Sequence, residues 1–405
     1  IFEAHSNHRY NTADYRKIDP LLGTEEDFRQ LCDAAHQAGM AVILDGVFSH
    51  TGSDSIYFNR EGRYGNSGAF RDPQSPYRKW YQFEQYPYRY HSWWGIDTLP
   101  NVNEEEPTYL DFICADDGVL AFWMGLGADG FRLDVADELP DCFLDAVRRQ
   151  LKKHGARLLI GEVWEDASNK IAYGQRRRYL LGEQLDGVMN YPLQKAILRY
   201  VRRENDGAEF GQQVMTLAEN YPPHVLNACM NLLSTHDTPR AINALLDPHD
   251  GSRDDLARRH FSPDQIIWGK ELLRTAAFLQ FTLPGAPCIY YGDEAGMTGY
   301  RDPFNRGFYP WGEEDTNLQA FYRALARLKR ENPALKTGRV EFITASNGRV
   351  QFLRQSAGQT AMVFCNASRE PWRVQYAGKL LFGGKLQAYT PEAVTLGENG
   401  FCVMV

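Results

Sequence analysis

The sequence lacks three features that would place it in familiar classes of protein. It has no run of about 18 or more apolar residues, so no segment is long enough for a membrane-spanning helix. It has no Cys-x-x-Cys pair of the kind that indicates a zinc or redox site. It also has no excess of basic residues, because 44 Lys and Arg stand against 52 Asp and Glu.

The formal net charge of −8 argues against a nucleic-acid or anionic-membrane partner, since either would call for a clustered Lys/Arg face. The one basic run, Arg176–Arg178, is short enough to be a solvated helix face. Neutral substrates fit this surface best. Seven scattered cysteines are expected to be small buried apolar residues in a reducing compartment, which predicts a cytoplasmic location.

The 405 residues do not begin with Met, and Ile1 to Ser6 do not resemble a signal peptide. We therefore expect a truncated or processed chain. Its length and its 43% hydrophobic content suffice for one large domain and a small one.

Apolar strand-like runs alternate with amphipathic helical ones, which is typical of a parallel α/β sheet or barrel. In the first unit, Thr24 and Asp27 can form a capping box, and Gly39 ends the helix before the strand 40–48. The same rhythm predicts five more strands. These lie at 130–134, 157–163, 186–190, 229–233 and 288–291.

Two regions break this rhythm. Residues 51–106 hold turn residues and nine aromatics between Tyr77 and Trp94, which indicates a functional loop or a small inserted subdomain. The aromatics could be the core of that subdomain or a wall that stacks on sugars, and the sequence leaves both readings open. From 335 to 405, short alternating segments with Asn-Gly and Gly-Gly turns predict an antiparallel β domain.

Three of the apolar runs bring an acidic residue to their ends: Asp134, Glu162 and Asp237. Carboxylates beside buried strands are costly unless something pairs with them or uses them. Cleavage of a glycosidic bond needs a close pair of carboxyl groups, one ionised and one protonated. In a parallel barrel the carboxyl ends of the strands meet around one pocket, so these three residues are candidates for one active site.

Four ordered motifs give the chain a specific resemblance. They are Asp45-Gly-Val-Phe-Ser-His50, Gly130-Phe-Arg-Leu-Asp134, Gly161-Glu-Val-Trp164 and Ser234-Thr-His-Asp237. With them the chain resembles glycoside hydrolase family 13, the α-amylase family. Met189-Asn-Tyr-Pro192 and Leu99-Pro-Asn-Val-Asn103 resemble the neopullulanase, cyclomaltodextrinase and maltogenic amylase group within it.

The resemblance implies a (β/α)8 TIM barrel with an inserted loop-rich subdomain after its third strand and a C-terminal antiparallel β domain. It also implies that the first strand and helix of the barrel are missing here. The expected divisions are 1–50, from the end of strand 2 to strand 3; 51–106, the insertion; 107–334, the rest of the barrel; and 335–405, a C-terminal β-sandwich.

The resemblance also implies a role for each matching residue. Asp134 would be the nucleophile, Glu162 the acid and base, and Asp237 the carboxylate that binds the distorted transition state. Arg132 lies two residues before Asp134 on the same strand face and would hold it ionised. The other implied substrate contacts are Tyr10, His50, Trp164, His236, Asp302 and Arg306. Asp45 is expected to be a structural partner of Arg132 rather than a catalyst.

The implied function is a retaining α-glucan hydrolase that cleaves α-1,4 bonds of maltodextrins, cyclodextrins or pullulan through a covalent glycosyl intermediate. A 4-α-glucanotransferase is the main alternative, because only the acceptor differs, and a non-catalytic carbohydrate-binding relative is a third reading. No cofactor is required for the chemistry. Structural calcium, and a homodimer of the full-length protein, stay open.

Overall fold

The computed structural model describes residues 1–155 and 157–405, and these residues form two compact units. One unit comprises residues 1–163 and 167–188, and the other comprises residues 164–166 and 189–405. None of the helices in the described ranges combines the length and the apolar content needed to cross a membrane.

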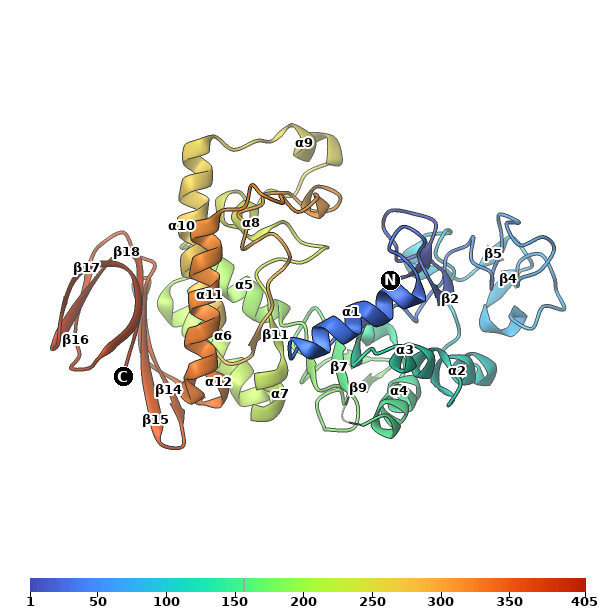
Figure 1. Cartoon of the computed structure of the whole chain (residues 1–405), viewed down its shortest axis with the longest axis horizontal. Helices are drawn as coiled ribbons and strands as arrows, with labels where there is room; N and C mark the ends of the chain where they lie inside the picture. The colour runs from blue at the N-terminus through green and yellow to red at the C-terminus, as the bar shows by residue number, and fades with distance from the viewer. Residues whose placement is uncertain (156) are drawn as a thin grey trace. The chain divides into compact units, whose positions relative to one another are not determined.

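A four-stranded parallel sheet is the centre of the first unit (Figure 1). Its strands lie in the order β10 (Gly187–Val188), β7 (Leu158–Gly161), β6 (Gly130–Leu133) and β3 (Ile43–Gly46). The described residues of the same unit also form helices α1 (Glu25–Gln37), α2 (Pro107–Cys114), α3 (Val119–Gly125) and α4 (Asp141–Lys153). The predicted strands at 40–48, 130–134, 157–163 and 186–190 are all present, although each is shorter than its apolar run.

Helix α1 begins as the sequence predicts. The Thr24 hydroxyl accepts a hydrogen bond from the Asp27 backbone N–H, and the Asp27 carboxylate accepts one from the Thr24 backbone N–H. This capping box satisfies two N–H groups that the helix itself leaves without a partner. The chain continues from α1 into β3, and Asp45 lies near the end of that strand.

The stretch 51–106 contains little regular structure. Its elements are η1 (Arg78–Trp80), β4 (Phe83–Gln85), β5 (Arg89–Tyr90) and η2 (Trp93–Gly95), and β4 pairs with β5 in an antiparallel hairpin. Some of its aromatic residues are buried, as the core reading predicts, and the sugar-stacking reading stays a prediction. Trp80 and Tyr81 are buried, whereas Trp94 and Tyr88 are each 80% exposed.

The second unit holds a short parallel pair, β11 (Met230–Asn231) and β12 (Ala286–Pro287), among helices. The helices are α5 (Tyr191–Val201), α6 (Gly207–Asn220), α7 (Pro223–Ala228), α8 (Ala241–Leu246), α9 (Arg253–Arg258), α10 (Pro263–Thr282), α11 (Thr316–Glu331) and α12 (Pro333–Thr337). The strand predicted at 288–291 is shifted toward the N-terminus. The paired residues lie two positions earlier, with Ala286 opposite Met230 and Pro287 opposite Asn231. Gly285 lies close to the Asn231 side chain, where a Cβ atom would come within 2.3 Å of Oδ1.

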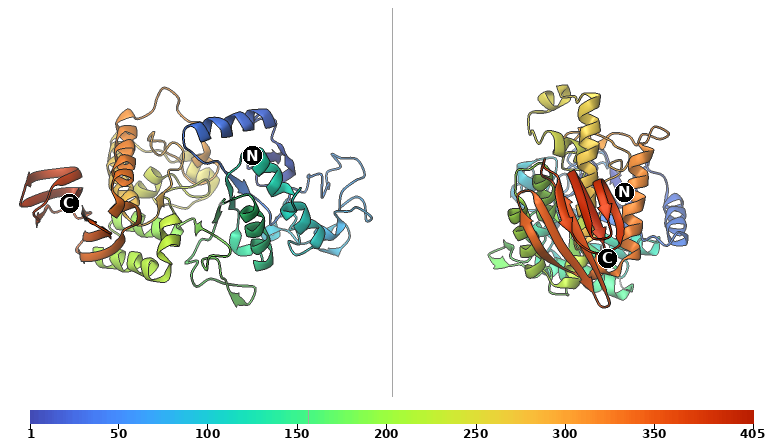
Figure 2. Two further views of the ribbon diagram at one scale, coloured as in Figure 1. Left: turned by 60° about the horizontal axis from the view of Figure 1, so that its bottom comes forward. Right: turned by 90° about the vertical axis from the view of Figure 1, so that its left-hand side faces the viewer.

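The C-terminal part of this unit is the predicted antiparallel β domain. Its strands are β13 (Arg339–Ser346), β14 (Arg349–Ser356), β15 (Gln359–Asn366), β16 (Trp372–Gln375), β17 (Leu380–Thr390) and β18 (Ala393–Met404). They form one sheet, seen in Figure 2, in which β18 pairs with β15, β16 and β17. Phe364, Leu396 and Cys402 are fully buried in its core, and the sheet packs beside α10 through β18.

Candidate active site

Arg132 is the centre of a cluster of carboxylates in the first unit. It lies on β6, directly opposite Asp45 of β3 in the parallel register. Its Nη1 donates to Asp45 Oδ1 at 2.7 Å and to Asp134 Oδ1 at 2.9 Å, and its Nη2 lies 2.9 Å from Glu162 Oε2. One guanidinium therefore bridges three carboxylates, and the predicted pairing of Asp45 with Arg132 is confirmed.

Asp134 and Glu162 each follow the last residue of a central strand, as the sequence predicts. Asp134 comes directly after β6 and Glu162 directly after β7, and they are only 7% and 3% exposed. The backbone N–H of Val135 donates to Glu162 Oε2 at 3.0 Å. Val135 has φ of 38°, a left-handed conformation that is costly for a β-branched residue and is concentrated at functional sites.

The charges of this cluster do not balance, since three carboxylates share one guanidinium. Burial raises the pKa of Asp134 well above its usual range, the Arg132 guanidinium lowers it, and the charges of Asp45 and Glu162 raise it again. The predicted contact of Arg132 with Asp134 is confirmed. Burial and the neighbouring carboxylates oppose the ionised form that this contact favours, so the cluster is suited to holding a proton among its carboxyl groups.

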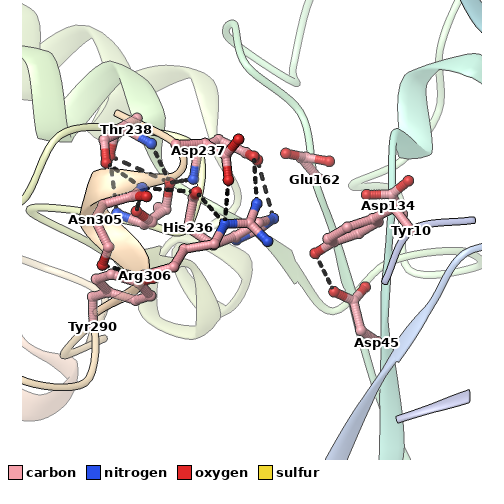
Figure 3. A network of polar contacts seen from close by, with 12 residues as sticks. Tyr10, Asp45, Asp134, Glu162, His236, Asp237, Thr238, Tyr290, Asn305 and Arg306 are labelled. Carbon is pink, nitrogen blue, oxygen red and sulfur yellow. Dashed lines mark hydrogen bonds and ion pairs between the residues drawn. The ribbon is translucent and has the colours of Figure 1, made fainter. Parts of the chain in front are cut away.

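Tyr10 and His50 complete the cluster (Figure 3 labels Tyr10). The Tyr10 hydroxyl donates to Asp45 Oδ2 at 2.7 Å. His50 Nε2 lies 3.0 Å from the Tyr10 carbonyl oxygen, and its Nδ1 lies 3.0 Å from the Ser49 hydroxyl. Burial lowers the pKa of His50 to about 4, so the ring is neutral near pH 7. A carbonyl can only accept, so the proton lies on Nε2. We call Tyr10, Asp45, His50, Arg132, Asp134 and Glu162 the Arg132 cluster.

The second unit contains a cluster of its own around Asp237, also visible in Figure 3. His236 Nε2 lies 3.1 Å from Asp237 Oδ2, and Arg306 Nη2 lies 3.7 Å from Asp237 Oδ1. Arg306 also pairs with Asp302 Oδ1 at 2.9 Å. Four of the predicted site residues of this unit are thus brought together. We call His236, Asp237, Asp302, Asn305 and Arg306 the Arg306 cluster.

Asn305 belongs to this second cluster although it was not among the predicted site residues. Its fully buried amide donates to the carbonyl oxygens of Thr235, His236 and Thr238, at 3.1, 2.7 and 2.9 Å. These bonds fix the turn that carries Asp237. The one available signal was its place next to Arg306 in the chain.

Trp164 packs against Tyr191, a residue of its own unit. Its ring stacks on Tyr191 with centroids 3.9 Å apart and planes 10° from parallel. The stack holds the indole in a fixed orientation, and a sugar contact by Trp164 stays a prediction.

A metal site is not evident in either unit. Within residues 1–155 and 157–405, no three His, Cys, Asp or Glu side chains lie together in a way that could hold a metal ion. Structural calcium therefore stays an open expectation.

Comparisons with known proteins agree with this picture. Residues 1–345 match the profile described as "Alpha amylase, catalytic domain". An amylopullulanase of Thermoanaerobacter thermohydrosulfuricus is 38% identical over 381 residues, which cover 85% of this chain and 25% of that protein. A cyclomaltodextrinase of Geobacillus thermopakistaniensis is 31% identical over 400 residues, which cover 94% of this chain and 61% of that protein. The chain thus spans less than two thirds of either relative.

Solved structures show the same relationship. The debranching enzyme of Nostoc punctiforme superposes with a TM-score of 0.83 and 28% identity, covering all of this chain and 84% of that one. Relatives named neopullulanase and maltogenic α-amylase also match. The family resemblance of the four motifs is therefore confirmed. The chain belongs to the α-amylase family, and it has that family's TIM-barrel catalytic domain together with a C-terminal antiparallel sheet domain.

Proposed function

We propose that this protein is a retaining α-glucan hydrolase that cleaves α-1,4-glucosidic bonds of maltodextrins, cyclodextrins or pullulan. The observation that carries the proposal is the bridge that Arg132 makes between Asp134 and Glu162. Retaining cleavage needs two carboxyl groups that are close neighbours, one to attack and one to move a proton. A single guanidinium that contacts both groups supports such closeness.

In the proposed reaction, an oxygen of Asp134 attacks the anomeric carbon. The bond from that carbon to the glycosidic oxygen breaks, and Glu162 gives its proton to the departing oxygen. In the second step Glu162 takes a proton from water, the water oxygen bonds to the anomeric carbon, and Asp134 leaves as a carboxylate. The N–H of Val135 supports Glu162 in its ionised state between the steps.

Asp237 is proposed to bind substrate hydroxyls in the distorted transition state rather than to exchange protons. His236 and Arg306 contact its two carboxylate oxygens and support that role by fixing its orientation. The remaining proposed substrate contacts are Tyr10, His50, Arg132, Trp164 and Asp302. We propose no cofactor for the chemistry.

The domain division is part of the proposal. Residues 1–50 and 107–334 would form the barrel, 51–106 an inserted subdomain and 335–405 a C-terminal domain. The scarcity of regular structure in 51–106 supports the insertion. All seven cysteines are free thiols, which supports the predicted cytoplasmic location. A homodimer of the full-length protein stays a prediction.

The test is product analysis. The chain is incubated with maltotriose, a cyclodextrin and pullulan, and the size of the products is followed over time. We expect shorter sugars from each substrate. Longer oligomers growing from maltotriose would favour the transferase alternative, and release of no sugar from any of them would contradict both readings.

Two variants sharpen this test. Asp134→Asn removes the proposed nucleophile and should lower kcat at least about 1,000-fold. Asp116→Asn makes the same chemical change on a side chain that is 79% exposed and pairs with Lys153, so its kcat should equal that of the wild type. An unchanged kcat in Asp134→Asn would show that the nucleophile assignment is wrong.

A further inference from the structure

A cavity of about 450 Å³ lies in the first unit, between the stretch 82–105, the start of α4 and the hairpin of β8 (Ile171–Ala172) and β9 (Gln175–Arg176). The described residues that line it include no member of the Arg132 cluster. Its size falls in the range of small-molecule sites. The cavity is therefore a feature separate from the proposed catalytic groups.

The lining of this cavity is rich in groups that both donate and accept hydrogen bonds. Asn101, Asn103 and Gln175 present side-chain amides. The Oδ1 atom of Asn101 is buried and has no hydrogen-bond partner in the described chain. Leaving such an acceptor unsatisfied costs about 1–3 kcal/mol, so a ligand hydroxyl that donates to Asn101 would be bound favourably.

The cavity carries less negative charge than the number of its acidic side chains suggests. Burial, followed by the nearby charges of Glu138 and Glu105, raises the pKa of Glu104 to about 8. At pH 7 the Glu104 carboxyl is therefore mostly neutral and can donate as well as accept. Asp141 is compensated by Arg177 at 3.3 Å and Arg178 at 3.7 Å. A neutral polyol suits these groups better than a cation or an anion does.

Tyr173 provides an aromatic wall. It lies in the turn between β8 and β9, has φ of 53° and is 62% exposed. Its hydroxyl donates to the backbone carbonyl oxygen of Glu138, and the Arg177 guanidinium lies 5.5 Å from its ring centroid. An exposed ring that is held in a fixed orientation on a strained backbone is a feature typical of binding sites.

Hydrogen bonds also connect Tyr173, through Glu138 and Val135, to Glu162, the proposed catalytic acid. The Glu138 backbone N–H donates to the Val135 carbonyl oxygen at 2.9 Å, and the Val135 N–H donates to Glu162 at 3.0 Å. The Glu138 carboxylate accepts a further bond from the indole N–H of Trp94 at 2.9 Å. One short turn of chain thus separates Tyr173 from the Arg132 cluster.

We propose that this cavity is an accessory sugar site, which binds a glucosyl unit outside the reacting bond through Asn101, Asn103, Glu104 and Gln175, with Tyr173 as the stacking surface. It rests on the proposed function only for the identity of the sugar, an α-glucan unit. Side-chain amides and a neutral carboxylic acid each donate and accept hydrogen bonds, which matches the vicinal hydroxyls of such a unit.

Cys142 offers a direct reporter of occupancy. It lines the cavity and is exposed, whereas the other six cysteines are buried or half-buried. Its thiol donates to Glu105 Oε1 at 3.4 Å. Burial raises the pKa of the thiol, so alkylation is slow; it is followed over a long incubation at pH 7, where the Glu104 carboxyl is still mostly neutral.

The experiment measures the rate at which iodoacetamide alkylates Cys142 in the full chain, by mass spectrometry of its peptide, with and without maltose. Maltose at about four times its dissociation constant should slow the reaction about fivefold. Sorbitol at the same concentration should not. An equal rate with and without maltose would overturn the proposal.

Variants locate the bound sugar. Tyr173→Ala and Asn101→Ala should each remove most of the protection, and the Asn101 Oδ1 atom that the second variant deletes has no hydrogen-bond partner in the described chain. Tyr88→Ala removes an exposed ring that is not among the residues lining the cavity and should keep the protection. Tyr10→Ala alters the Arg132 cluster and should keep it too; protection that vanished in Tyr10→Ala would place maltose at that cluster and overturn the proposal.

Failure of this inference is separable from failure of the proposed function. If the wild type releases sugar from maltotriose while maltose leaves Cys142 unprotected, the accessory site is wrong and the hydrolase stands. If Cys142 is protected and no substrate is cleaved, the cavity binds sugar and the hydrolase proposal fails.

Discussion

At the scale of single residues, Arg132 carries the proposed chemistry because it contacts three carboxylates through two terminal nitrogens. A lysine at this position would keep one positive charge but could not bridge the same oxygens, since an ammonium lacks the planar fork of a guanidinium. The contacts at 2.7 to 2.9 Å are those of charge-assisted hydrogen bonds.

We therefore predict that Arg132→Lys lowers kcat/KM by about 100-fold or more, a loss similar to that of one electrostatic partner in an active site. Steady-state kinetics on maltotriose checks the prediction. Arg149→Lys, at an exposed position of α4 in the same unit, is the matched control and should leave kcat/KM unchanged. Near-normal activity in Arg132→Lys would show that charge alone suffices at this position.

His50 allows a prediction about pH. Its folded pKa of about 4 lies below the usual value near 6.5, so the unfolded chain binds a proton that the folded chain does not. The contribution to stability is complete above pH 6.5 and is lost as the pH falls toward 4. The free energy of unfolding should drop by about 2 kcal/mol between pH 7.5 and pH 5 on account of this group.

Urea unfolding at both pH values measures that drop, with His50→Gln as the comparison. Glutamine keeps a polar side chain but has no proton to gain, so the variant should lose about 2 kcal/mol less than the wild type over the same interval. Equal pH dependence in the two proteins would mean that His50 is not the group that titrates.

At the scale of elements, the parallel pairing of β6 with β7 places Asp134 and Glu162. Gly130, the first residue of β6, allows that pairing, because a Cβ atom there would lie 2.0 Å from the Leu158 carbonyl oxygen. The obstacle is backbone rather than a flexible side chain, so the strands would have to separate.

Gly130→Ala should therefore lower the free energy of unfolding by about 3 kcal/mol or more and weaken activity with it. Gly125→Ala, in the last turn of α3, is the control: nothing lies within 4 Å of its added Cβ atom. It should be neutral or stabilising by up to about 1 kcal/mol. Chemical denaturation of both variants distinguishes the two effects, and equal stability would contradict the close approach of β6 and β7.

The elements also show what the sequence could predict. The helix from Thr24 and the strands that end near Asp134 and Glu162 were predictable because capping residues and apolar runs are local signals. The register that sets Asp45 opposite Arg132 was not, since it depends on pairing between distant segments. The strand predicted at 288–291 lies at Ala286–Pro287 for the same reason.

The candidate site shows the same division between local and distant signals. Asp134, Glu162 and Asp237 could be nominated because each ends an apolar run within a recognisable motif. Asn305 could not, because its role is to bond three carbonyl oxygens about 70 residues earlier in the chain. Its buried amide became visible only once those segments were brought together.

At the scale of the whole molecule, the C-terminal sheet is bound to the helices of its own unit. The Tyr200 hydroxyl donates to the Cys365 carbonyl oxygen at 3.1 Å, and the Thr275 hydroxyl donates to that of Asn399 at 3.0 Å. Phe278 and Phe401 stack with their centroids 4.4 Å apart. Removing the sheet would leave apolar and polar groups of α5 and α10 exposed.

A chain that ends after Gly338 should therefore bind a hydrophobic dye strongly and sediment as aggregates, whereas the chain of 405 residues should do neither. Dye fluorescence and analytical ultracentrifugation compare the two. A truncated chain that stays monomeric and folded would show that the sheet is an independent appendage.

The central claim is that Asp134 forms a covalent bond to the sugar, so that two displacements leave the anomeric configuration unchanged. The most direct measurement is proton NMR of the reducing end released from a cyclodextrin or maltotetraose during the first minutes of reaction, before mutarotation. We predict that the α-anomer appears first and converts slowly to the β-anomer. Initial release of the β-anomer would contradict the account.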